Sequence, residues 1–499
     1  MKFRAVAASL LSFLFLHFSP ARNTDDVKPL ELGSRLELFV DDTLIESMRG
    51  VELKLHPPRS AGKVLSFDRP WEGGTSDYIS VFKDGDRYRM YYRGSTHFAK
   101  GLTVHSMLES GETVTPDHPA FTCYAESRDG VHWTRPSLGL FEFNGSRDNN
   151  IVWTGAHGDP AHCFMAFRDE NPQAPEDQRY KALANYHSPG LKHVMGVVSA
   201  DGIHWRLIQD EPLITQAVDW GGDLAFWDSE REEYVAYLRG LRGQRVREVV
   251  RSTSPDFIHW TPPEFIDVGD TQPEHFYTNA ANPYFRAPHI FLAFPRRMVP
   301  WRTLAPFRSQ RYAGASDVVL LSSRDGQHWR RTFMEAFIRP GRHVRNWIHR
   351  ANTPATGLVP TGPDELSLYV QRHYTFPSVH LERFVLRTDG FSSANAGAEE
   401  GEFVTKPLTF EGDSLVLNFA TSAAGGIQIE IQDVFGNPMP GFSLEESPIV
   451  WGDEIEHAVR WDRSRSRKTS EQLMRRIAGD PVKLRFVMKD ADLYSLKFR

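Results

Sequence analysis

The 499-residue chain has few cysteines and no excess of basic charge. Its two cysteines, Cys123 and Cys163, are too few for a disulfide-dense scaffold or a cysteine-based zinc cluster. One bridge between them stays open, because both also stand in apolar strand-like runs where cysteine behaves as a small hydrophobe. The formal net charge is −6 with mixed signs, so no basic stripe is available to follow a phosphate backbone. Nucleic acid is therefore not expected as a partner.

Long apolar runs are also scarce, and the sizeable one stands at the N-terminus. It covers residues 5–18, follows Lys2 and Arg4, and precedes the small-residue sequence 19–21. This pattern is that of a signal peptide over residues 1–21, and the run is too short to span a bilayer. The sequence predicts a secreted or periplasmic protein with no membrane insertion after cleavage. An uncleaved anchor is the alternative, and it would export the rest of the chain as well.

What the chain has instead is aromatic residues and turn formers. Aromatic residues make up 12% of the chain, and there are 37 glycines and 32 prolines. Stretches with a helical period are scarce, so many short strands joined by turns are expected. The length exceeds what one hydrophobic core usually organises. The sequence therefore predicts an all-β protein with more than one domain.

A turn motif recurs along the chain. Ser-Arg-Asp-Gly-Val-His-Trp at 127–133 returns with small changes at 199–205 and 323–329, a looser copy runs from Ser252 through Asp256 to Trp260, and a degenerate copy occupies 388–391. Asp bonds its own backbone in such a turn, and Gly accepts a positive φ. Unrelated hairpins that share turn chemistry are the alternative explanation.

A second element precedes each copy of the motif, which argues against that alternative. It is a polar turn followed by an alternating, mostly aromatic or aliphatic strand, and the five copies begin near residues 83, 178, 232, 288 and 364. Strand and turn keep the same order each time, as in a four-stranded unit repeated around an axis. We expect a five-bladed β-propeller over residues 22–394.

The composition changes after the last repeat. Residues 392–402 are small and acidic and are interpreted as a linker, and a new set of alternating segments then begins at Phe403. Segments such as 427–431 and 493–498 have the period of strands. We expect a C-terminal β-sandwich over residues 403–499.

Together these features resemble the five-bladed propeller superfamily of arabinanases, levansucrases and invertases, whose members often carry a C-terminal β-sandwich. The Phe39-Val40-Asp41-Asp42 opening and the segment 493–498 are similar to a family-32-like bacterial branch of glycosyl hydrolases. The invertase-type Asn-Asp-Pro-Asn-Gly block is absent. The resemblance implies a carbohydrate partner and hydrolysis of glycosidic bonds by carboxylates on the inner strands of the propeller.

Three acidic residues fit these roles. Asp77 stands at the start of the first inner strand and is the candidate nucleophile or base, unless it only caps that strand. Asp223 is favoured over Asp219 as the carboxylate of the third blade. Asp219 stays open as the alternative, because the start of that strand is not fixed by the sequence. Glu274 is the candidate general acid, because packing among His, Phe and Tyr would raise its pKa. A solvated surface role is its alternative.

Five further residues are expected to bind substrate. They are His162, Asp219, His275, Trp347 and Arg350. His162 precedes the second inner strand, which lacks the superfamily's usual carboxylate unless Asp159 supplies it. Trp347 would stack on a sugar face, and Arg350 would bond hydroxyls or hold an acidic group on the substrate. No metal-site motif is present and no cofactor is expected, although a calcium or sodium ion on the propeller axis would leave no mark in the sequence.

The leading hypothesis is a secreted glycoside hydrolase, and two alternatives stay open. A non-catalytic, carbohydrate-binding propeller would bind a glycan whether or not its carboxylates were changed to amides. A sialidase-like enzyme is suggested by the turn motif, but it would need six blades, an arginine triad and a tyrosine nucleophile. The sugar, the linkage, the stereochemistry and the oligomeric state are not determined by the sequence.

Overall fold

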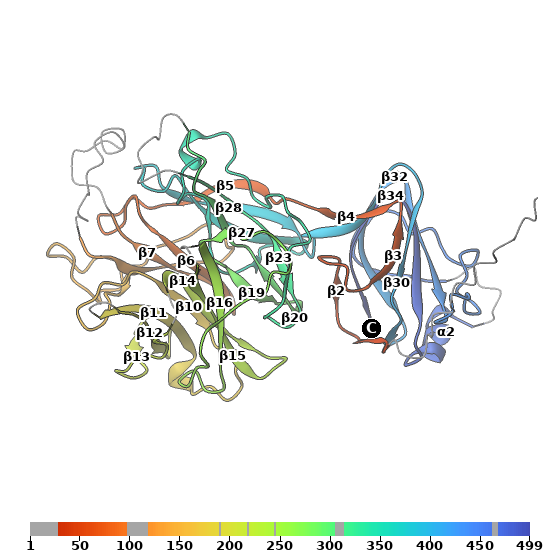
Figure 1. Cartoon of the computed structure of the whole chain (residues 1–499), viewed down its shortest axis with the longest axis horizontal. Helices are drawn as coiled ribbons and strands as arrows, with labels where there is room; N and C mark the ends of the chain where they lie inside the picture. Colours follow the sequence, from red (N-terminus) through yellow and green to blue (C-terminus); the bar gives the residue numbers. More distant parts are fainter. Residues whose placement is uncertain are drawn as a thin grey trace, which may run out of the picture.

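The computed structural model describes residues 28–96, 118–188, 191–216, 219–243, 246–304, 314–461 and 468–499. The expected signal peptide, residues 1–21, lies outside these ranges. The described chain consists mainly of β-strands with one α-helix, α2 (Ser470–Ile477), so the all-β class is confirmed. Figure 1 shows two lobes, a larger one that holds β5 to β28 and a smaller one that holds β2 to β4, β30, β32, β34 and α2.

The larger lobe begins with three antiparallel four-stranded units, in which each strand pairs with the next. Unit 1 is β6 (Asp77–Asp84), β7 (Arg87–Gly94), β8 (Phe121–Ser127) and β9 (Ile151–Trp153). Unit 2 is β10 (Phe164–Arg168), β11 (Tyr180–Ser188), β12 (Leu191–Ser199) and β13 (Arg206–Leu207). Unit 3 is β14 (Asp219–Asp228), β15 (Glu233–Arg242), β16 (Val246–Ser254) and β17 (Glu264–Phe265).

Units 4 and 5 are built on the same plan with interruptions. Unit 4 is β19 (Ala281–Tyr284), β20 (Ala287–Ala293), β23 (Leu321–Ser323) and β24 (Trp329–Arg330), extended by β18 (His275–Phe276), β21 (Arg296–Val299) and β22 (Ala315–Val318). Unit 5 is β25 (Thr353–Pro354), β26 (Val359–Pro360), β27 (Glu365–Arg372), β28 (His380–Arg387) and β5 (Arg59–Ser66). The outer strand of unit 5 therefore comes from the N-terminal part of the chain.

The units contact one another in cyclic order. In three places a tyrosine hydroxyl on the second strand of one unit donates to the turn-motif glycine carbonyl of the next; the pairs are Tyr91 with Gly202 (2.8 Å), Tyr237 with Gly326 (2.7 Å) and Tyr369 with Gly130 (2.6 Å). Between units 2 and 3, Leu183 and Phe257 take these positions and pack in one apolar cluster. Between units 4 and 5 the Tyr284 hydroxyl donates to Asp389.

The last unit also contacts the first through the backbone. Thr356, in the segment between β25 and β26, forms a parallel bridge with Ser80 of β6. The amide of Thr356 donates to the carbonyl of Ile79, and its carbonyl accepts from the amide of Val81, both at 2.8 Å. Unit 5 thus lies beside unit 1, and the first strands of all five units face a common centre.

The turn motif owes its recurrence to a local hydrogen-bond pattern. Asp129 Oδ1 accepts from the amides of Val131 and His132 at 2.8 Å, and its Oδ2 lies 2.7 Å from His132 Nδ1. The hydrogen bond from the His132 side chain, together with those from the backbone, holds the pKa of Asp129 far below its usual range. The same bonds form around Asp201, Asp256 and Asp325.

Two copies of the motif differ from the sequence-based expectation. In the looser copy the hydroxyl that donates to Asp256 belongs to Ser254, two residues beyond the expected Ser252. In the degenerate copy, Asp389 is fully buried and accepts from Tyr284, Ser495 and Asn418, the last two of which belong to the smaller lobe. The fifth turn therefore connects the two lobes.

The glycine of the turn motif allows a close approach between units, and this can be tested. Gly202 has φ +76°, and a Cβ there would lie 2.6 Å from the Tyr91 hydroxyl, whereas Gly85 has φ +61° with nothing within 4 Å. Alanine at Gly85 carries only the left-handed backbone penalty of about 1–2 kcal/mol. Alanine at Gly202 adds crowding of about 1–3 kcal/mol. We expect Gly202→Ala to lower the melting temperature more than Gly85→Ala; equal shifts would mean that the Tyr91 contact does not matter.

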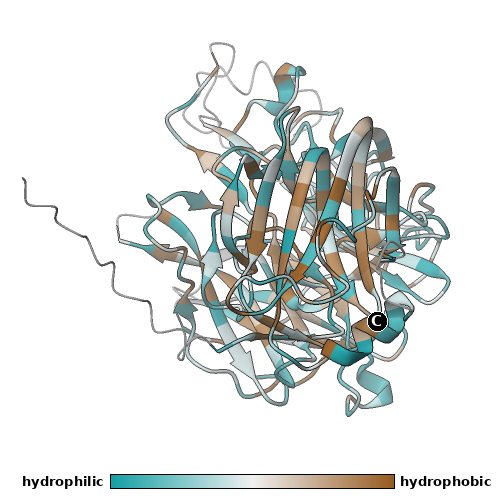
Figure 2. Cartoon of the chain, turned by 90° about the vertical axis from the view of Figure 1, so that its right-hand side faces the viewer, coloured by the Kyte–Doolittle hydropathy of each residue, from teal (hydrophilic) through white to brown (hydrophobic). Residues whose placement is uncertain are grey.

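The smaller lobe is a sheet of long strands. From the C-terminal part it contains β29 (Ser392–Ala396), β30 (Gly401–Thr405), β32 (Leu415–Gln432), β33 (Asp453–Ala458) and β34 (Lys483–Phe498), and β31 (Leu408–Phe410) lies beside it. β32 and β34 pair along most of their length. Figure 2 faces this lobe and shows apolar and polar segments alternating along the strands. Its core contains the stacked rings of Phe403 and Phe486 and the buried Trp461.

The boundaries of the two lobes differ from those expected. β1 (Leu30–Gly33), β2 (Glu37–Leu38), β3 (Ile45–Arg49) and β4 (Val51–Leu55) pair with strands of the smaller lobe, so the expected start of the propeller at residue 22 is wrong. The expected linker at 392–402 instead contains all of β29 and the first two residues of β30. Its small residues serve packing, because a Cβ at Gly401 would lie 2.3 Å from the Gly50 carbonyl oxygen. The thiols of Cys123 and Cys163 are both free and buried.

Candidate active site

Two register shifts place acidic residues where first strands begin. In β6, Asp77 pairs with Arg93 and Ser80 with Tyr91, so one extra residue is inserted between them. Tyr78 in this bulge has φ +50°, which is uncommon for a residue other than glycine. In β14 a larger irregularity separates Asp219 from Leu224 and contains Asp223. Bulges of this kind redirect side chains and are frequent beside active sites.

Asp77 is a buried carboxyl group with one oxygen left over. It is 2% exposed; its Oδ2 accepts from Thr353 Oγ1 at 3.2 Å and lies 3.8 Å from Arg296 Nη1. Its Oδ1 has no hydrogen-bond partner among the described residues. Burial raises the pKa of Asp77, and the charges of Arg296 and Arg93 only partly oppose this. The group can therefore exchange protons nearer to neutral pH than an exposed aspartate.

Asp223 is equally buried but more firmly bonded. Its Oδ2 accepts from Asn185 Nδ2 at 2.9 Å, and its Oδ1 accepts from the backbone amide of Arg239 at 3.1 Å. Burial, and then the charge of Asp223, raise the pKa of Cys163 to about 12, so these two groups are neighbours. The side chain of Asp219 lies outside what the structure describes; its backbone begins β14 opposite Arg239.

Arginine side chains gather around Tyr277, which is 8% exposed. The guanidinium carbons of Arg296, Arg239 and Arg247 lie 4.2, 4.5 and 5.1 Å from the centre of its ring. Burial tends to raise the pKa of Tyr277, but the charges of Arg350, Arg239, Arg296 and Arg247 lower it to about 8. Gly221 makes room for this cluster, because a Cβ there would lie 2.4 Å from the Arg239 guanidinium.

Two more tyrosines connect this cluster to Asp77. The Arg93 guanidinium lies 4.6 Å from the centre of the Tyr78 ring and donates to the Tyr374 hydroxyl at 3.4 Å. Arg350 also bonds the Tyr374 hydroxyl. Every unit therefore supplies polar side chains to one region at the strand starts; they include Asp77 and Arg93 of unit 1, Asn185 of unit 2, Asp223 and Arg239 of unit 3, Tyr277 and Arg296 of unit 4, and Arg350 and Thr353 of unit 5.

The four other residues that were predicted to bind substrate differ in where they lie relative to this cluster. His162 Nδ1 lies 3.2 Å from Arg93 Nη1 and its ring lies beside Tyr78, so it joins the site. Arg350 joins it as well. His275 accepts from the amide of Arg247, and burial together with that arginine lowers its pKa. Trp347 donates to the carbonyl of Gly341, and no hydrogen bond links it to the arginine cluster among the described residues.

Glu274 lies in an ion-pair network. Its Oε1 is 3.0 Å from Arg297 Nη1, and its Oε2 is 2.7 Å from Arg331 Nη2. Arg297 also pairs with Asp317 at 2.7 Å. Both oxygens of Glu274 are engaged by guanidinium groups, and within the described part of the chain no hydrogen bond or ion pair connects Glu274 to Asp77. The arrangement suits a structural ion pair better than a proton donor.

Sequence reasoning did not find Tyr277, Arg239, Arg296 or Thr353. A signal exists in the repeat register, because the fifth residue after the first aromatic of the second strand is Arg93 in unit 1, Asn185 in unit 2 and Arg239 in unit 3. In each case a polar side chain ends an otherwise apolar strand segment. Aligning the repeats column by column would have marked this position as exceptional.

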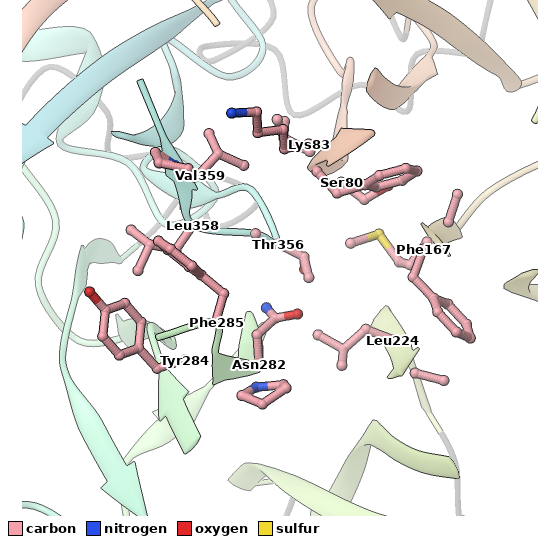
Figure 3. A pocket seen from close by; sticks show the side chains of 18 residues that line it. Ser80, Lys83, Phe167, Leu224, Asn282, Tyr284, Phe285, Thr356, Leu358 and Val359 are labelled. Atoms are coloured by element: carbon pink, nitrogen blue, oxygen red, sulfur yellow. The ribbon is translucent and has the colours of Figure 1, made fainter. Parts of the chain in front are cut away.

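An axial cavity of about 300 Å³ lies farther along the same first strands. Ser80, Met165, Leu224, Asn282 and Thr356, one from each unit, are among the residues that line it, and Figure 3 shows several of them converging. Asp77 and Asp223 precede Ser80 and Leu224 in the chain, so the charged cluster lies at the strand starts and the mostly apolar cavity lies beyond it.

The described residues contain neither a membrane-spanning helix nor a cluster of metal ligands. No described helix is both long and apolar enough to cross a lipid bilayer. Within the same residues, no three His, Cys, Asp or Glu side chains lie together in a way that would hold a metal ion.

The state of Tyr277 can be measured. A pKa of about 8 predicts that one tyrosine ionises well below the usual value of 10, which is visible as phenolate absorbance near 295 nm. Tyr277→Phe should remove this early step. Arg350→Gln should move it to higher pH, because a positive charge that favours the phenolate is lost. An unchanged early step in Tyr277→Phe would assign it to another tyrosine.

Comparisons with known proteins give matches in structure only. No family model and no curated protein sequence matches the chain. Among solved structures, a glycoside hydrolase aligns with 66% of this chain and 92% of its own, at 13% identity and a TM-score of 0.43. The fructofuranosidase of Schwanniomyces occidentalis covers 87% of this chain and 96% of its own (10% identity, TM-score 0.41). The beta-1,2-mannobiose phosphorylase of Listeria innocua covers 65% and 94% (11% identity, TM-score 0.44).

These similarities are distant. The names of all three solved proteins describe enzymes that act on carbohydrates. What the chain shares with them is a distant likeness of fold.

Proposed function

We propose that the protein is a secreted glycoside hydrolase that cleaves glycosidic bonds at the strand starts of its larger lobe. In this proposal the five units are the blades of a five-bladed β-propeller, and the smaller lobe is a β-sandwich. The cyclic contacts between units support the first part, and the N-terminal pattern of residues 1–21 supports secretion. No cofactor takes part.

The observation that carries the proposal is Asp77. Cleaving a glycosidic bond needs one carboxyl group to exchange a proton with the leaving oxygen and another to attack the sugar or activate water. Asp77 is buried, has a raised pKa and keeps Oδ1 without a partner among the described residues. Asp77 acts as nucleophile or base, and Asp223 supplies the second carboxyl group, which gives a proton to the leaving oxygen.

A sialidase-like reaction is the second candidate, and one observation favours it. Tyr277 has a lowered pKa and is surrounded by guanidinium groups, which is the combination of tyrosine nucleophile and arginines that such an enzyme requires. Five units, rather than six, argue against it. The third candidate, a non-catalytic carbohydrate-binding propeller, requires that glycan binding be the same with Asp77 as with an amide in its place.

The test is release of reducing sugar by the full-length chain from arabinans, fructans, galactans and sulfated algal polysaccharides, with a sialyl oligosaccharide included. Cleavage of one glycan by the wild type, and none by a folded Asp77→Asn variant, supports the glycosidase. Cleavage of the sialyl substrate that disappears in Tyr277→Phe favours the second candidate. Binding of a glycan without cleavage, unchanged in Asp77→Asn, favours the non-catalytic one.

A further inference from the structure

Arg350 differs from several other shielded arginines of this protein. Three of them have a carboxylate close by; Arg135 pairs with Glu72, Arg331 with Glu274 and Arg324 with Glu37, at 2.6–2.7 Å. Arg350 forms no ion pair with a carboxylate within the described part of the chain, and its neighbours are Tyr374, Tyr277 and Tyr78. Its Nε is buried and makes no hydrogen bond there.

Arg296 adds a second charge beside it. Arg296 is 1% exposed, and its Nη1 donates to the Arg350 carbonyl at 2.8 Å and to Thr353 Oγ1. Its Nε has no hydrogen-bond partner among the described residues, and its Nη1 lies 3.8 Å from Asp77 Oδ2. Arg93 likewise has Asp77 as a carboxylate neighbour. Asp77 thus faces two guanidinium groups, those of Arg296 and Arg93.

A shielded positive charge without a counter-ion is expensive, because water is lost and nothing replaces it. A protein retains such a group where a ligand supplies the missing charge. The guanidinium fork matches the planar or tetrahedral oxygens of a carboxylate or sulfate with two parallel hydrogen bonds. Arg350 is half-buried, so one side of it is accessible to a ligand.

We propose that the sugar bound at this site carries an oxyanion group, a carboxylate or a sulfate, and that Arg350 and Arg296 bind it. The inference rests on the proposed function and names its substrate class: polysaccharides of uronic acids or sulfated sugars. The bound anion then holds the sugar next to Asp77, because Arg296 binds the anion and also lies 3.8 Å from the Asp77 carboxylate.

The test compares polymers that differ only in charge. A polyuronate is used before and after reduction of its carboxyl groups to alcohols, and a sulfated polysaccharide before and after desulfation. We expect kcat/KM of the full-length chain to be about 10- to 100-fold higher on one of the charged polymers than on its neutral form. The pair that shows the difference identifies carboxylate or sulfate.

Two substitutions complete the design. Arg350→Gln should bring the charged-to-neutral ratio close to one, and Arg350→Lys should keep part of it, since the charge remains and the fork is lost. Arg342→Gln, at an exposed position in the same segment, should leave the ratio unchanged. Melting temperatures confirm that each variant is folded.

The outcomes separate the two proposals. If neutral polymers are cleaved as fast as charged ones, and Arg350→Gln changes nothing, the anionic substrate is wrong while hydrolysis stands. If a charged polymer binds without being cleaved, and Arg350→Gln weakens the binding, the anion site stands while hydrolysis fails. Turnover that requires added inorganic phosphate and ignores the charge of the sugar would assign the guanidinium groups to phosphate and overturn the inference.

Discussion

Asp77→Asn is expected to lower kcat/KM for glycan cleavage by about 10²- to 10⁴-fold, the range typical of losing an acid–base group. The amide has the same shape and can still accept from Thr353, and a melting temperature checks that the variant folds despite the charge lost beside Arg296 and Arg93. What it lacks is the negative charge and the ability to take a proton. Because the group is 2% exposed, bulk water cannot substitute for it.

The matched control is Asp86→Asn. Asp86 lies in the turn between β6 and β7 of the same unit, and it pairs with the exposed Arg128 at 3.1 Å. An exposed pair of this kind contributes about 0–1 kcal/mol. Activity should therefore be unchanged in Asp86→Asn. Full activity in Asp77→Asn would remove Asp77 from the mechanism.

The pH profile gives an independent test of the same residue. A nucleophile or base must be ionised, so activity is lost as the pH falls through its pKa. Burial raises the pKa of Asp77 above the ordinary 3.8, with Arg296 and Arg93 opposing. The acid limb of kcat/KM should therefore lie above pH 3.8. Thr353→Val removes a hydrogen bond that favours the charged form, so the limb should move to still higher pH.

The parts of the fold that the sequence predicted are those with local chemistry. The turn motif is recognisable because Asp129 and its equivalents bond amides two and three residues ahead, so a short segment contains the whole pattern. Strand pairing between distant segments leaves no such mark. β2 pairs with β34, more than 450 residues later, and nothing in Glu37 or Leu38 indicates this partner. The N-terminal boundary of the larger lobe was therefore misplaced.

The same distinction applies to the site. Asp77 could be proposed because a carboxylate that adjoins an apolar strand needs a special environment. Glu274 was chosen for its His, Phe and Tyr neighbours in sequence, but Arg297 and Arg331 come from later segments of the chain and decide its surroundings. Tyr277 acquires its character from four arginines of three different units. A pKa that depends on such long-range contacts is not readable from one segment.

The second large effect is expected at the contact between the lobes. Glu37 of β2 is 2% exposed; its Oε1 lies 2.9 Å from His289 Nε2 and its Oε2 lies 2.6 Å from Arg324 Nη1. Asp41, 1% exposed, lies 3.4 Å from Arg324 Nε. Arg324 belongs to the turn motif of unit 4, so one arginine pairs with two buried carboxylates of the other lobe.

Arg324→Ala should lower the free energy of unfolding by about 3–5 kcal/mol, because breaking a buried pair leaves an uncompensated charge. The matched control is Arg128→Ala, the same position of the turn motif in unit 1. Arg128 is 80% exposed and pairs with the exposed Asp86, so its loss should change stability by less than about 1 kcal/mol. Thermal unfolding at neutral pH measures both, and equal shifts would contradict the role of Arg324.

The pH dependence should distinguish lost charge pairing from lost packing. Burial alone would raise the pKa of Glu37, but the hydrogen bond from His289 and the charge of Arg324 lower it below the ordinary 4.5. In the wild type this contribution to stability is present above pH 4.5 and is lost as the pH falls through the lowered pKa. Without Arg324, burial has less to oppose it and the carboxylates protonate more readily. The difference in stability between wild type and Arg324→Ala should therefore be largest at neutral pH and shrink in acid, whereas a packing defect would leave it constant.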